Sequence, residues 1–316
     1  MWDFSIGKAL GVLLHTAPFI LIRMAIYFGI TLAYLLATGG GAGVGYGIGQ
    51  VSEEPESFAV WGGIIGFGIV SFALYWVREY ILYMVKAAHI AVMVELVDGR
   101  SVMPDGKGQI AHGQAVVQAR FGEANVLFVL DQLIKGVIRA ITGLVGGIGM
   151  LLPGLDGLVR FVNTVIRLSL TYVDEIILAY NIRTNSQNPW ESGRQGLVLY
   201  AQNGGRMVKN AVWLALFLWL LTAVIFLVLI GPAATVVYLF PGAASGFAVA
   251  IAVIAALAFK AAVLEPFAIA ALMEVYFKTI EGQTPNPDWD AKLAATSKKF
   301  AEIRDKAIAG PGRQIA

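Results

Sequence analysis

Four long apolar runs, separated by polar segments, dominate the pattern of this 316-residue chain. The runs extend over about Pro18–Ala37, Val60–Val85, Val212–Ile230 and Gly246–Tyr276. Each holds about 20 residues or more, and a helix of that length, about 30 Å, can cross the hydrocarbon core of a bilayer. The pattern therefore predicts an all-α integral membrane protein with four transmembrane helices.

Lysine and arginine are missing from two long stretches of the chain, residues 38–76 and 210–259. Each stretch contains a polar gap between two apolar runs, whereas all 23 Lys and Arg residues lie elsewhere. Basic residues in short loops stay on the cytoplasmic side of a membrane. We therefore predict that the loops at Glu53 and at Pro232–Ser245 face outward and that both termini are cytoplasmic. The expected location is a bacterial inner (cytoplasmic) membrane.

The segment between the second and third runs, about Val126–Ile182, is apolar but interrupted by charge. Asp131, Lys135 and Arg139 recur every four residues, which places them on one face of a helix. Three arrangements are open: amphipathic helices in the membrane interface, a re-entrant pair buried in protein, or two full crossings. The charged face itself predicts a solvated helix surface, with a pore lining or a contact to anionic lipid as the alternative.

Polarity divides the chain into five segments. They are a two-span region, a cytoplasmic polar linker, a segment of amphipathic, interfacial or re-entrant helices, a second two-span region and a basic cytoplasmic tail. A surface helix is expected near Pro189–Tyr200, and the tail is expected to be partly helical after Pro287. In order, the five segments are residues 1–97, 98–125, 126–209, 210–277 and 278–316.

Composition supports a membrane protein and removes several classes of function. The chain is 58% hydrophobic and 14% charged, with a mean hydropathy of +0.72, whereas soluble domains have about 25% charged residues. The net charge of +2 is too small to indicate nucleic acid binding. Cysteine is absent, and His15, His89 and His112 have no second ligand at metal-binding spacing. We therefore expect no metal, no cofactor and, without a recognisable catalytic motif, no enzyme activity.

A glycine-rich tract, Gly39–Gly49, follows the first run and contains the sequence Val44-Gly45-Tyr46-Gly47. A Thr-Val-Gly-Tyr-Gly loop forms the selectivity filter of potassium channels, but this tract lacks the threonine and the preceding pore helix. We interpret the tract as a glycine-rich helix end and turn. A small-residue face that predicts close helix packing opens the second run at Gly62, Gly63, Gly66 and Gly68.

Charged residues inside the apolar runs are the strongest functional candidates, because partners or water must offset their cost in a membrane. Lys260 and Glu265 lie in the fourth run, and Pro266 is expected to kink the helix just after the carboxylate. Their five-residue spacing places Lys260 and Glu265 about 140° apart around a helix, so each is expected to pair with another helix. Arg23 in the first run is the expected counter-charge for Glu265.

Arg78, Glu79 and Lys86 lie in the last turns of the second run. They are interpreted as interhelical ion pairs or as side chains that reach the interface, with a pathway role as the alternative. The candidate pathway or gating residues of the chain are Arg23, Arg78, Glu79, Lys260 and Glu265.

Two parts of the C-terminal half carry a resemblance to a known family. A polar link from Asn181-Ile182-Arg183 to Lys209-Asn210 precedes the third run, and Ala271-Leu272-Met273-Glu274-Val275-Tyr276 ends the last run. That ending leads into Glu281-Gly282-Gln283-Thr284-Pro285-Asn286-Pro287 and a polar helix. In these features, over less than half of its length, the chain resembles the choline-transporter-like family, whose members are longer, with more spans and large extracellular loops. The resemblance implies a transporter-like role and identifies no residue as a choline contact.

The function we predict is membrane transport or channel-like passage of a small solute or ion through a helical assembly. Four spans enclose little space and their glycine faces favour packing, so a homo-oligomer is expected. The alternative is a non-transporting scaffold component, whose central helices and basic tail recruit a partner or shape the bilayer. The expected partners are the lipid bilayer, further copies of the chain and anionic lipid.

Overall fold

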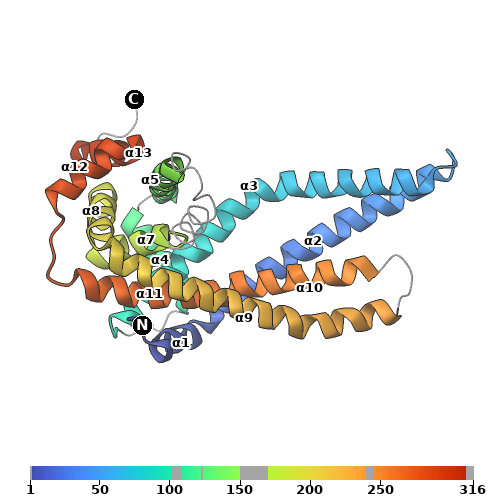
Figure 1. Ribbon diagram of the computed structural model, residues 1–316, viewed down its shortest axis with the longest axis horizontal. Coiled ribbons are helices and arrows are strands. Elements are labelled where there is room, and N and C mark those ends of the chain that lie inside the picture. The colour runs from blue at the N-terminus through green and yellow to red at the C-terminus, as the bar shows by residue number, and fades with distance from the viewer. Residues whose placement is uncertain (1, 101–107, 122–123, 150–169, 240–244, 311–316) are drawn as a thin grey trace. The chain divides into compact units, whose positions relative to one another are not determined.

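A computed structural model describes residues 2–100, 108–121, 124–149, 170–239 and 245–310 of the chain. The structure is 88% helical and has no strand among these residues, which confirms the predicted all-α fold class. The helices in chain order (Figure 1) are α1 (Ile6–His15), α2 (Ala17–Gly49), α3 (Pro55–Val97), α4 (Gln109–Phe121), α5 (Ala124–Gly149), α7 (Val173–Thr184), α8 (Pro189–Gln202), α9 (Gly204–Leu239), α10 (Ser245–Phe259), a π-helical turn η1 (Lys260–Leu264), α11 (Glu265–Ile280), α12 (Pro287–Thr296) and α13 (Lys298–Ala309).

Among the described residues, four helical segments are long and apolar enough to cross a membrane. They coincide with the four apolar runs, so the four predicted spans are confirmed and the chain is a membrane protein. The sides on which the loops and termini lie stay predictions. The segments are Ala17–Gly49, Pro55–Tyr75, Gly204–Gly231 and Ala252–Ile280.

Contacts divide the chain into two compact units, each assembled from separate stretches of sequence. Unit 1 consists of Met1–Pro18, Lys86–Leu220 and Glu265–Ala316. Unit 2 consists of Phe19–Val85 and Leu221–Leu264.

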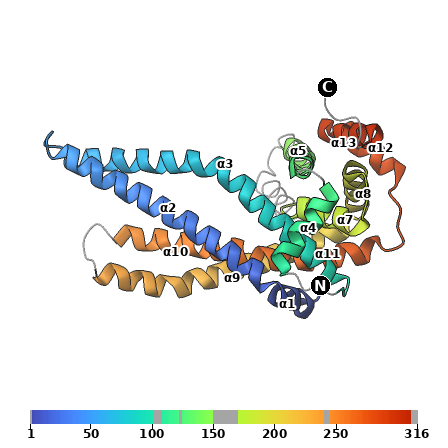
Figure 2. The same cartoon turned by 180° about the vertical axis from the view of Figure 1, so that it is seen from behind.

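Unit 2 contains an antiparallel hairpin of α2 and the first part of α3, in which the two helices touch through glycine (Figures 1 and 2). A methyl group on Gly41 would overlap the backbone carbonyl of Gly62, and one on Gly45 would overlap the carbonyl of Phe58. The close packing predicted from the small-residue face of the second run is therefore present. In this hairpin the two backbones are in direct contact.

The glycine tract Gly39–Gly49 is helical throughout, so the predicted helix end near Ala37 was wrong. Glycine costs a helix about 1 kcal/mol per residue relative to alanine. Close backbone packing against α3 offsets that cost, because the glycine face removes the side chains that would hold the helices apart. The turn between the helices comes later, where Glu53 takes a left-handed conformation with a φ of 60°. The tract is thus a packing face rather than a filter-like loop.

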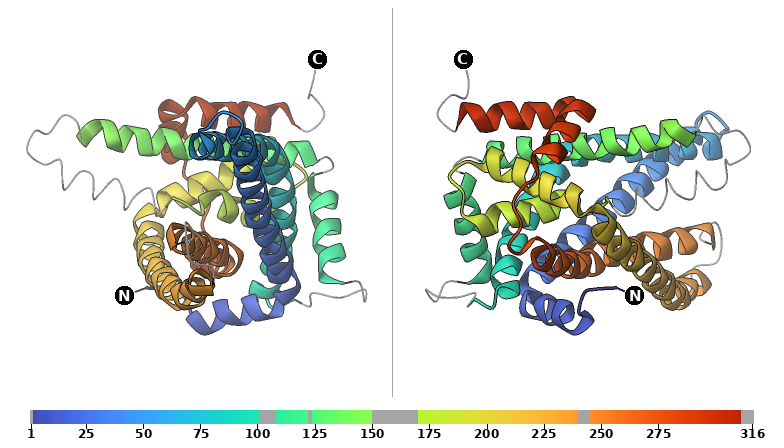
Figure 3. Two further views of the ribbon diagram at one scale, coloured as in Figure 1. Left: turned by 90° about the vertical axis from the view of Figure 1, so that its right-hand side faces the viewer. Right: turned by 60° about the vertical axis from the view of Figure 1, so that its left-hand side comes forward.

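Unit 1 is a bundle of shorter helices around α7 and α8 (Figure 3). Helix α8 packs against α7, α12 and α13, and α13 also packs against α5. The helix predicted near Pro189–Tyr200 is present as α8, but Trp190 and Leu199 are buried, so its expected surface location was wrong. The predicted polar linker, residues 98–125, contains α4, where His112 forms a 2.8 Å hydrogen bond with Glu95.

The predicted tail helix begins at Pro287, as expected, and the two C-terminal helices belong to the core of unit 1. Phe300 and Ile303 of α13 are fully buried. These helices therefore pack as part of a folded unit, and the tail is not a free basic arm.

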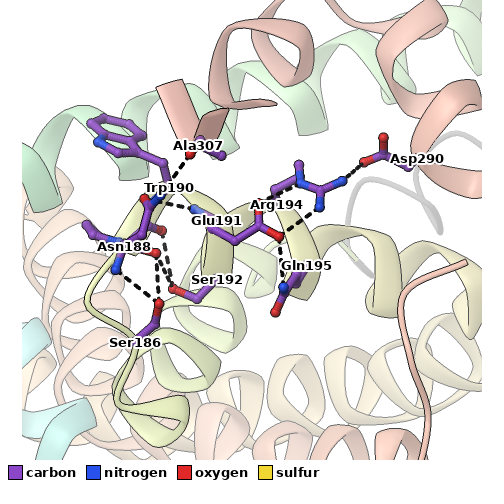
Figure 4. Close-up of polar contacts among 10 residues, drawn as sticks. Ser186, Asn188, Trp190, Glu191, Ser192, Arg194, Gln195, Asp290 and Ala307 are labelled. Atoms are coloured by element: carbon purple, nitrogen blue, oxygen red, sulfur yellow. Dashed lines mark hydrogen bonds and ion pairs between the residues drawn. The ribbon is translucent and has the colours of Figure 1, made fainter. Parts of the chain in front are cut away.

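Polar contacts also join the start of α8 to the C-terminal helices (Figure 4). Asn188 caps α8 by accepting a hydrogen bond from the N–H of Glu191 at 3.2 Å. Its side-chain amide donates to the carbonyl of Ala307 at 2.8 Å. Arg194 donates to Glu191 and to Asp290, each at 2.7 Å. One short segment thus holds α12 and α13 in place.

The hairpin predicts that two similar glycine substitutions change the stability of the protein in opposite directions. Gly45→Ala places a methyl group against the backbone of α3 and should destabilise the protein by about 1–3 kcal/mol. Gly47→Ala, on the same helix but with open space beside it, should stabilise by up to about 1 kcal/mol through helix propensity. Thermal unfolding in detergent measures both, and equal effects of the two substitutions would show that the helices do not touch at Gly45.

Candidate functional site

The break in the fourth span lies in unit 2, at the π turn Lys260–Leu264, and it holds the candidate residue Arg23. The guanidinium of Arg23 donates a 2.7 Å hydrogen bond from Nη2 to the carbonyl oxygen of Ala261. Arg23 is only 4% exposed. An arginine of the first span is therefore fixed to the backbone of the fourth.

The sequence explains why the Ala261 carbonyl needs this donor. In a π turn, the carbonyl of one residue accepts from the N–H five residues later. Five residues after Ala261 stands Pro266, which has no N–H. A carbonyl without a partner inside a membrane costs several kcal/mol, so the Arg23 guanidinium stabilises the break by supplying the missing donor.

The other candidate residues occupy different positions relative to this break. Lys260 is the first residue of the π turn and Glu265 the first of α11, and both are half-buried. Pro266 was expected to kink the helix just after Glu265; the structure instead has a π turn just before this carboxylate. Pairing of Glu265 with Arg23 stays a prediction. The side chains of Arg78 and Glu79 lie outside the described residues.

A polar face on α2 continues from Arg23, and the sequence interpretation missed it. Tyr27, Thr31, Tyr34 and Thr38 follow at intervals of four, four, three and four residues, which keeps them on one side of the helix. The four residues line a cavity of about 810 Å³. The opposite wall is apolar and contains Ile254, Leu257, Ala258 and Ala261.

The composition of this cavity is typical of a small-molecule site. Such sites have volumes of about 300–1,000 Å³ and are mostly apolar, with a few polar groups that orient the ligand. Here the polar groups are hydroxyls of one helix face, and Tyr34 packs against Phe67 with ring centroids 5.1 Å apart. Ala261 lines the cavity and its carbonyl accepts the hydrogen bond from Arg23, so the π turn forms part of the cavity wall.

A second unusual site, a buried ionic cluster, lies in unit 1 outside the membrane-spanning segments. Lys86 of α3 forms an ion pair with Glu175 of α7 and lies 3.9 Å from the carboxylate of Asp174. Lys135 of α5 lies 2.7 Å from Asp131 and 3.8 Å from Asp174. Three helices thus bring three carboxylates together with two ammonium groups.

The sequence predicted part of this cluster and misjudged its setting. Lys86 forms an interhelical ion pair, as one of its two interpretations predicted. Asp131 is only 7% exposed, so the solvated surface predicted for its helix face was wrong at this residue, whereas Arg139 is exposed. The partners Asp174 and Glu175 were missed, although two adjacent carboxylates in an apolar stretch are themselves a signal.

The charges of the described residues favour a protonated carboxyl group in this cluster. Within the part of the chain that the structure describes, three carboxylates face two ammonium groups, and the buried Glu175 Oε2 accepts no hydrogen bond there. Burial and then the neighbouring charge of Asp174 raise the pKa of Glu175 well above its ordinary value. Burial opposes ionisation of Asp174 too, but Lys86 and a hydrogen bond with Glu175 lower its pKa. A proton on Glu175 therefore completes the cluster.

The pKa values of Asp131 and Lys86 are shifted by the same set of neighbouring charges. Burial and then the charge of Asp174 raise the pKa of Asp131 to about 6, against the opposing effect of Lys135. Burial acts to lower the pKa of Lys86, yet Glu175 and Asp174 hold it above its usual value.

The chain matches no protein-family model, no curated protein and no solved structure. The resemblance to the choline-transporter-like family therefore stays a prediction. Among the described residues, no group of three or more potential ligands is arranged to hold a metal ion.

A double-mutant cycle tests the bond between Arg23 and the Ala261 carbonyl. Arg23→Met should lower the free energy of unfolding by about 1–3 kcal/mol, because the carbonyl loses its donor. Pro266→Ala restores a backbone N–H near the break, so the same arginine substitution should cost less in that background. Denaturant unfolding in detergent gives the four free energies. An arginine cost that is identical in both backgrounds would contradict this account.

The ionic cluster yields a prediction about pH. Folding raises the pKa of Asp131 from 3.8 to about 6, so the proton stabilises the folded protein at low pH, and this contribution is lost as pH rises through about 6. Relative to Asp131→Asn, the wild-type protein should therefore lose stability between about pH 4 and pH 7, by at most about 3 kcal/mol. The melting temperatures of both proteins across this range measure the difference.

The control for the pH experiment is Asp305→Asn, which removes a carboxylate that is 71% exposed. A stability difference between wild type and Asp131→Asn that stays constant from about pH 4 to pH 7 would exclude a proton held at Asp131 in the folded state.

Proposed function

We propose that this membrane protein passes a small solute or ion across the bilayer, in a transport or channel-like role, along the polar face of α2. The observation that supports this proposal is the cavity of about 810 Å³ lined by Tyr27, Thr31, Tyr34 and Thr38. Polar side chains are costly against lipid, and they mark solute paths when they gather on one face beside a cavity. A protein that only anchors or assembles does not need such a face.

The charged candidates are proposed to control this path. Arg23 and Lys260 belong to the same unit, and both lie at the π turn, which is an irregular piece of backbone at membrane depth. Irregular backbone is tolerated there only where it is buried in protein or lines a water-filled cavity. Glu265, next to the π turn in sequence, is proposed as a further gating residue. Arg78 and Glu79 stay proposals without structural support.

The second candidate function is a non-transporting scaffold component, and the exposure of the spans favours it. Between 11 and 39% of the residues in the four spanning windows are buried within the chain. The remaining surface must contact lipid or other protein, which also supports the proposed homo-oligomer. The glycine face of α2, however, packs within one chain and gives that oligomer no support.

The remaining proposals concern setting and chemistry. The protein is proposed to act without enzymatic activity, in a bacterial inner membrane, in contact with anionic lipid. The transporter-like role implied by the resemblance to the choline-transporter-like family agrees with the passage proposed here, but the lining of the cavity does not identify a substrate.

The absence of cysteine from the natural sequence allows a direct test of the path. Single cysteines at Thr31 and Lys260 should react with a small membrane-impermeant thiol reagent in sealed vesicles, because both positions are proposed to face water. Leu36→Cys is the matched control on α2, since Leu36 is 67% exposed on the surface of the span and should face lipid. Mass spectrometry of the purified protein measures the labelled fraction.

The same variants in detergent show whether each cysteine is intrinsically reactive. Labelling at Thr31 and Lys260 but not at Leu36 in vesicles supports a water-filled path. If Thr31→Cys and Lys260→Cys are as protected as Leu36→Cys in vesicles, the path does not exist and the scaffold function is favoured.

A further inference from the structure

Helix α1 has an apolar face that is left exposed by the described residues of its unit. Ile6, Leu10 and Leu14 are 41, 45 and 66% exposed, although each is a large hydrophobic residue. The helix is nevertheless well seated, because Ala9 and Leu13 are buried where α1 packs against α11. The exposed residues are spaced by four, so they form one continuous stripe.

The opposite side of α1 is polar. Lys8, Gly11 and His15 line a cleft of about 470 Å³ whose other walls carry Asp98, Arg183 and further charged residues. At about 100° per residue, the centre of this side lies about 130° away from the centre of the apolar stripe. Helix α1 therefore separates an apolar face from a charged face, as a helix at the boundary between lipid and water does.

The chain holds α1 at the level of the span ends. Its last residue is separated from the first candidate span only by Thr16. Just before α1, the backbone N–H of Ser5 donates to Glu274, near the end of the fourth candidate span, at 2.9 Å. Asp3 lies 2.8 Å from Lys209, at the start of the third. Hydrogen bonds from Lys209 and Asn210 lower the pKa of Asp3 to about 2, so this link stays charged at neutral pH.

Aromatic side chains lie at the same level. The rings of Trp2 and Trp213 meet edge to face with centroids 6.0 Å apart, and both residues are exposed. Trp213 lies in the first turns of the third span, and tryptophan is enriched at the interface between membrane and water.

We propose that α1 is an interfacial helix whose stripe, Ile6, Leu10 and Leu14, inserts into the boundary between the headgroups and acyl chains of the lipid bilayer. Its continuity with the first candidate span identifies lipid as the occupant of the stripe, because a helix fixed to three span ends lies at the bilayer surface. Interfacial helices bury their apolar face to a depth of about 5–10 Å. The charged side then faces the aqueous phase and carries Lys8 and His15.

The absence of cysteine again gives a clean experiment. Single nitroxide labels are attached to Leu10→Cys on the stripe and to Gly11→Cys on the polar side, where an added Cβ atom has open space around it. The full-length protein is reconstituted in vesicles of equal parts phosphatidylcholine and phosphatidylglycerol. Collision of each label with oxygen, which concentrates in lipid, is compared with collision with a water-soluble nickel chelate. Leu14→Cys is a second stripe position if Leu10→Cys does not fold.

Each outcome decides the proposal. Oxygen collisions that exceed nickel collisions several-fold on the stripe, with the reverse order at Gly11, support insertion into lipid. A stripe label that collides mainly with nickel shows that the stripe is in water and overturns the proposal. A stripe label that is immobilised and shielded from both reagents shows that protein, such as a second copy of the chain, covers the stripe, and this also overturns it.

Discussion

A helix that crosses a membrane has to satisfy its own backbone hydrogen bonds, and the fourth span cannot do so before Pro266. The chain solves this with a π turn whose Ala261 carbonyl accepts its hydrogen bond from Arg23 of the first span. The arginine thus acts as a substitute backbone donor. Tyr27 and Thr31 follow Arg23 by about one and two helical turns and so lie on the same side of α2. The bond that fixes Arg23 to the fourth span therefore also turns the polar face of α2 toward that span.

In unit 1 the groups that need partners are buried charged side chains rather than backbone carbonyls. Burying ions is costly unless each is paired, and α3, α5 and α7 bring their ionic groups to one place. Among the described residues one carboxylate is in excess, and burial and then the charge of Asp174 raise the pKa of Glu175. In unit 2, Arg23 supplies a hydrogen-bond donor that the neighbouring helix lacks. In unit 1, Lys86 of one helix balances the buried carboxylates of another.

The features that could be predicted from the sequence are those that depend on local residues, whereas features that depend on contacts with distant helices were missed. The four spans depend on composition, so they were predictable, whereas Pro266 indicated a break in the fourth span but not that it would be a π turn before Glu265. The glycine tract was misjudged because helix propensity is local, whereas the packing that overcomes it comes from α3. Asp131 was placed on the correct helix face, but its burial depends on Asp174 and Glu175, which belong to a helix distant in sequence. The hydrogen bond from Arg23 to the Ala261 carbonyl was not predicted, because a search for charge pairs does not indicate a carbonyl that a proline leaves without a donor.

Distances along the first span connect the interfacial helix to the proposed path. If α1 marks the bilayer boundary at Thr16, the helical rise places Arg23 about 10 Å along the span, inside the hydrocarbon region. A charge there is costly, so its bond to the Ala261 carbonyl stabilises both groups at once. Tyr27 and Thr38 then lie about 16 Å and about 33 Å along the span. The polar face therefore extends from within the hydrocarbon core to its far side. A path for a small solute has to cover this distance, whereas a helix that only anchors a protein in the membrane needs no polar residues along it.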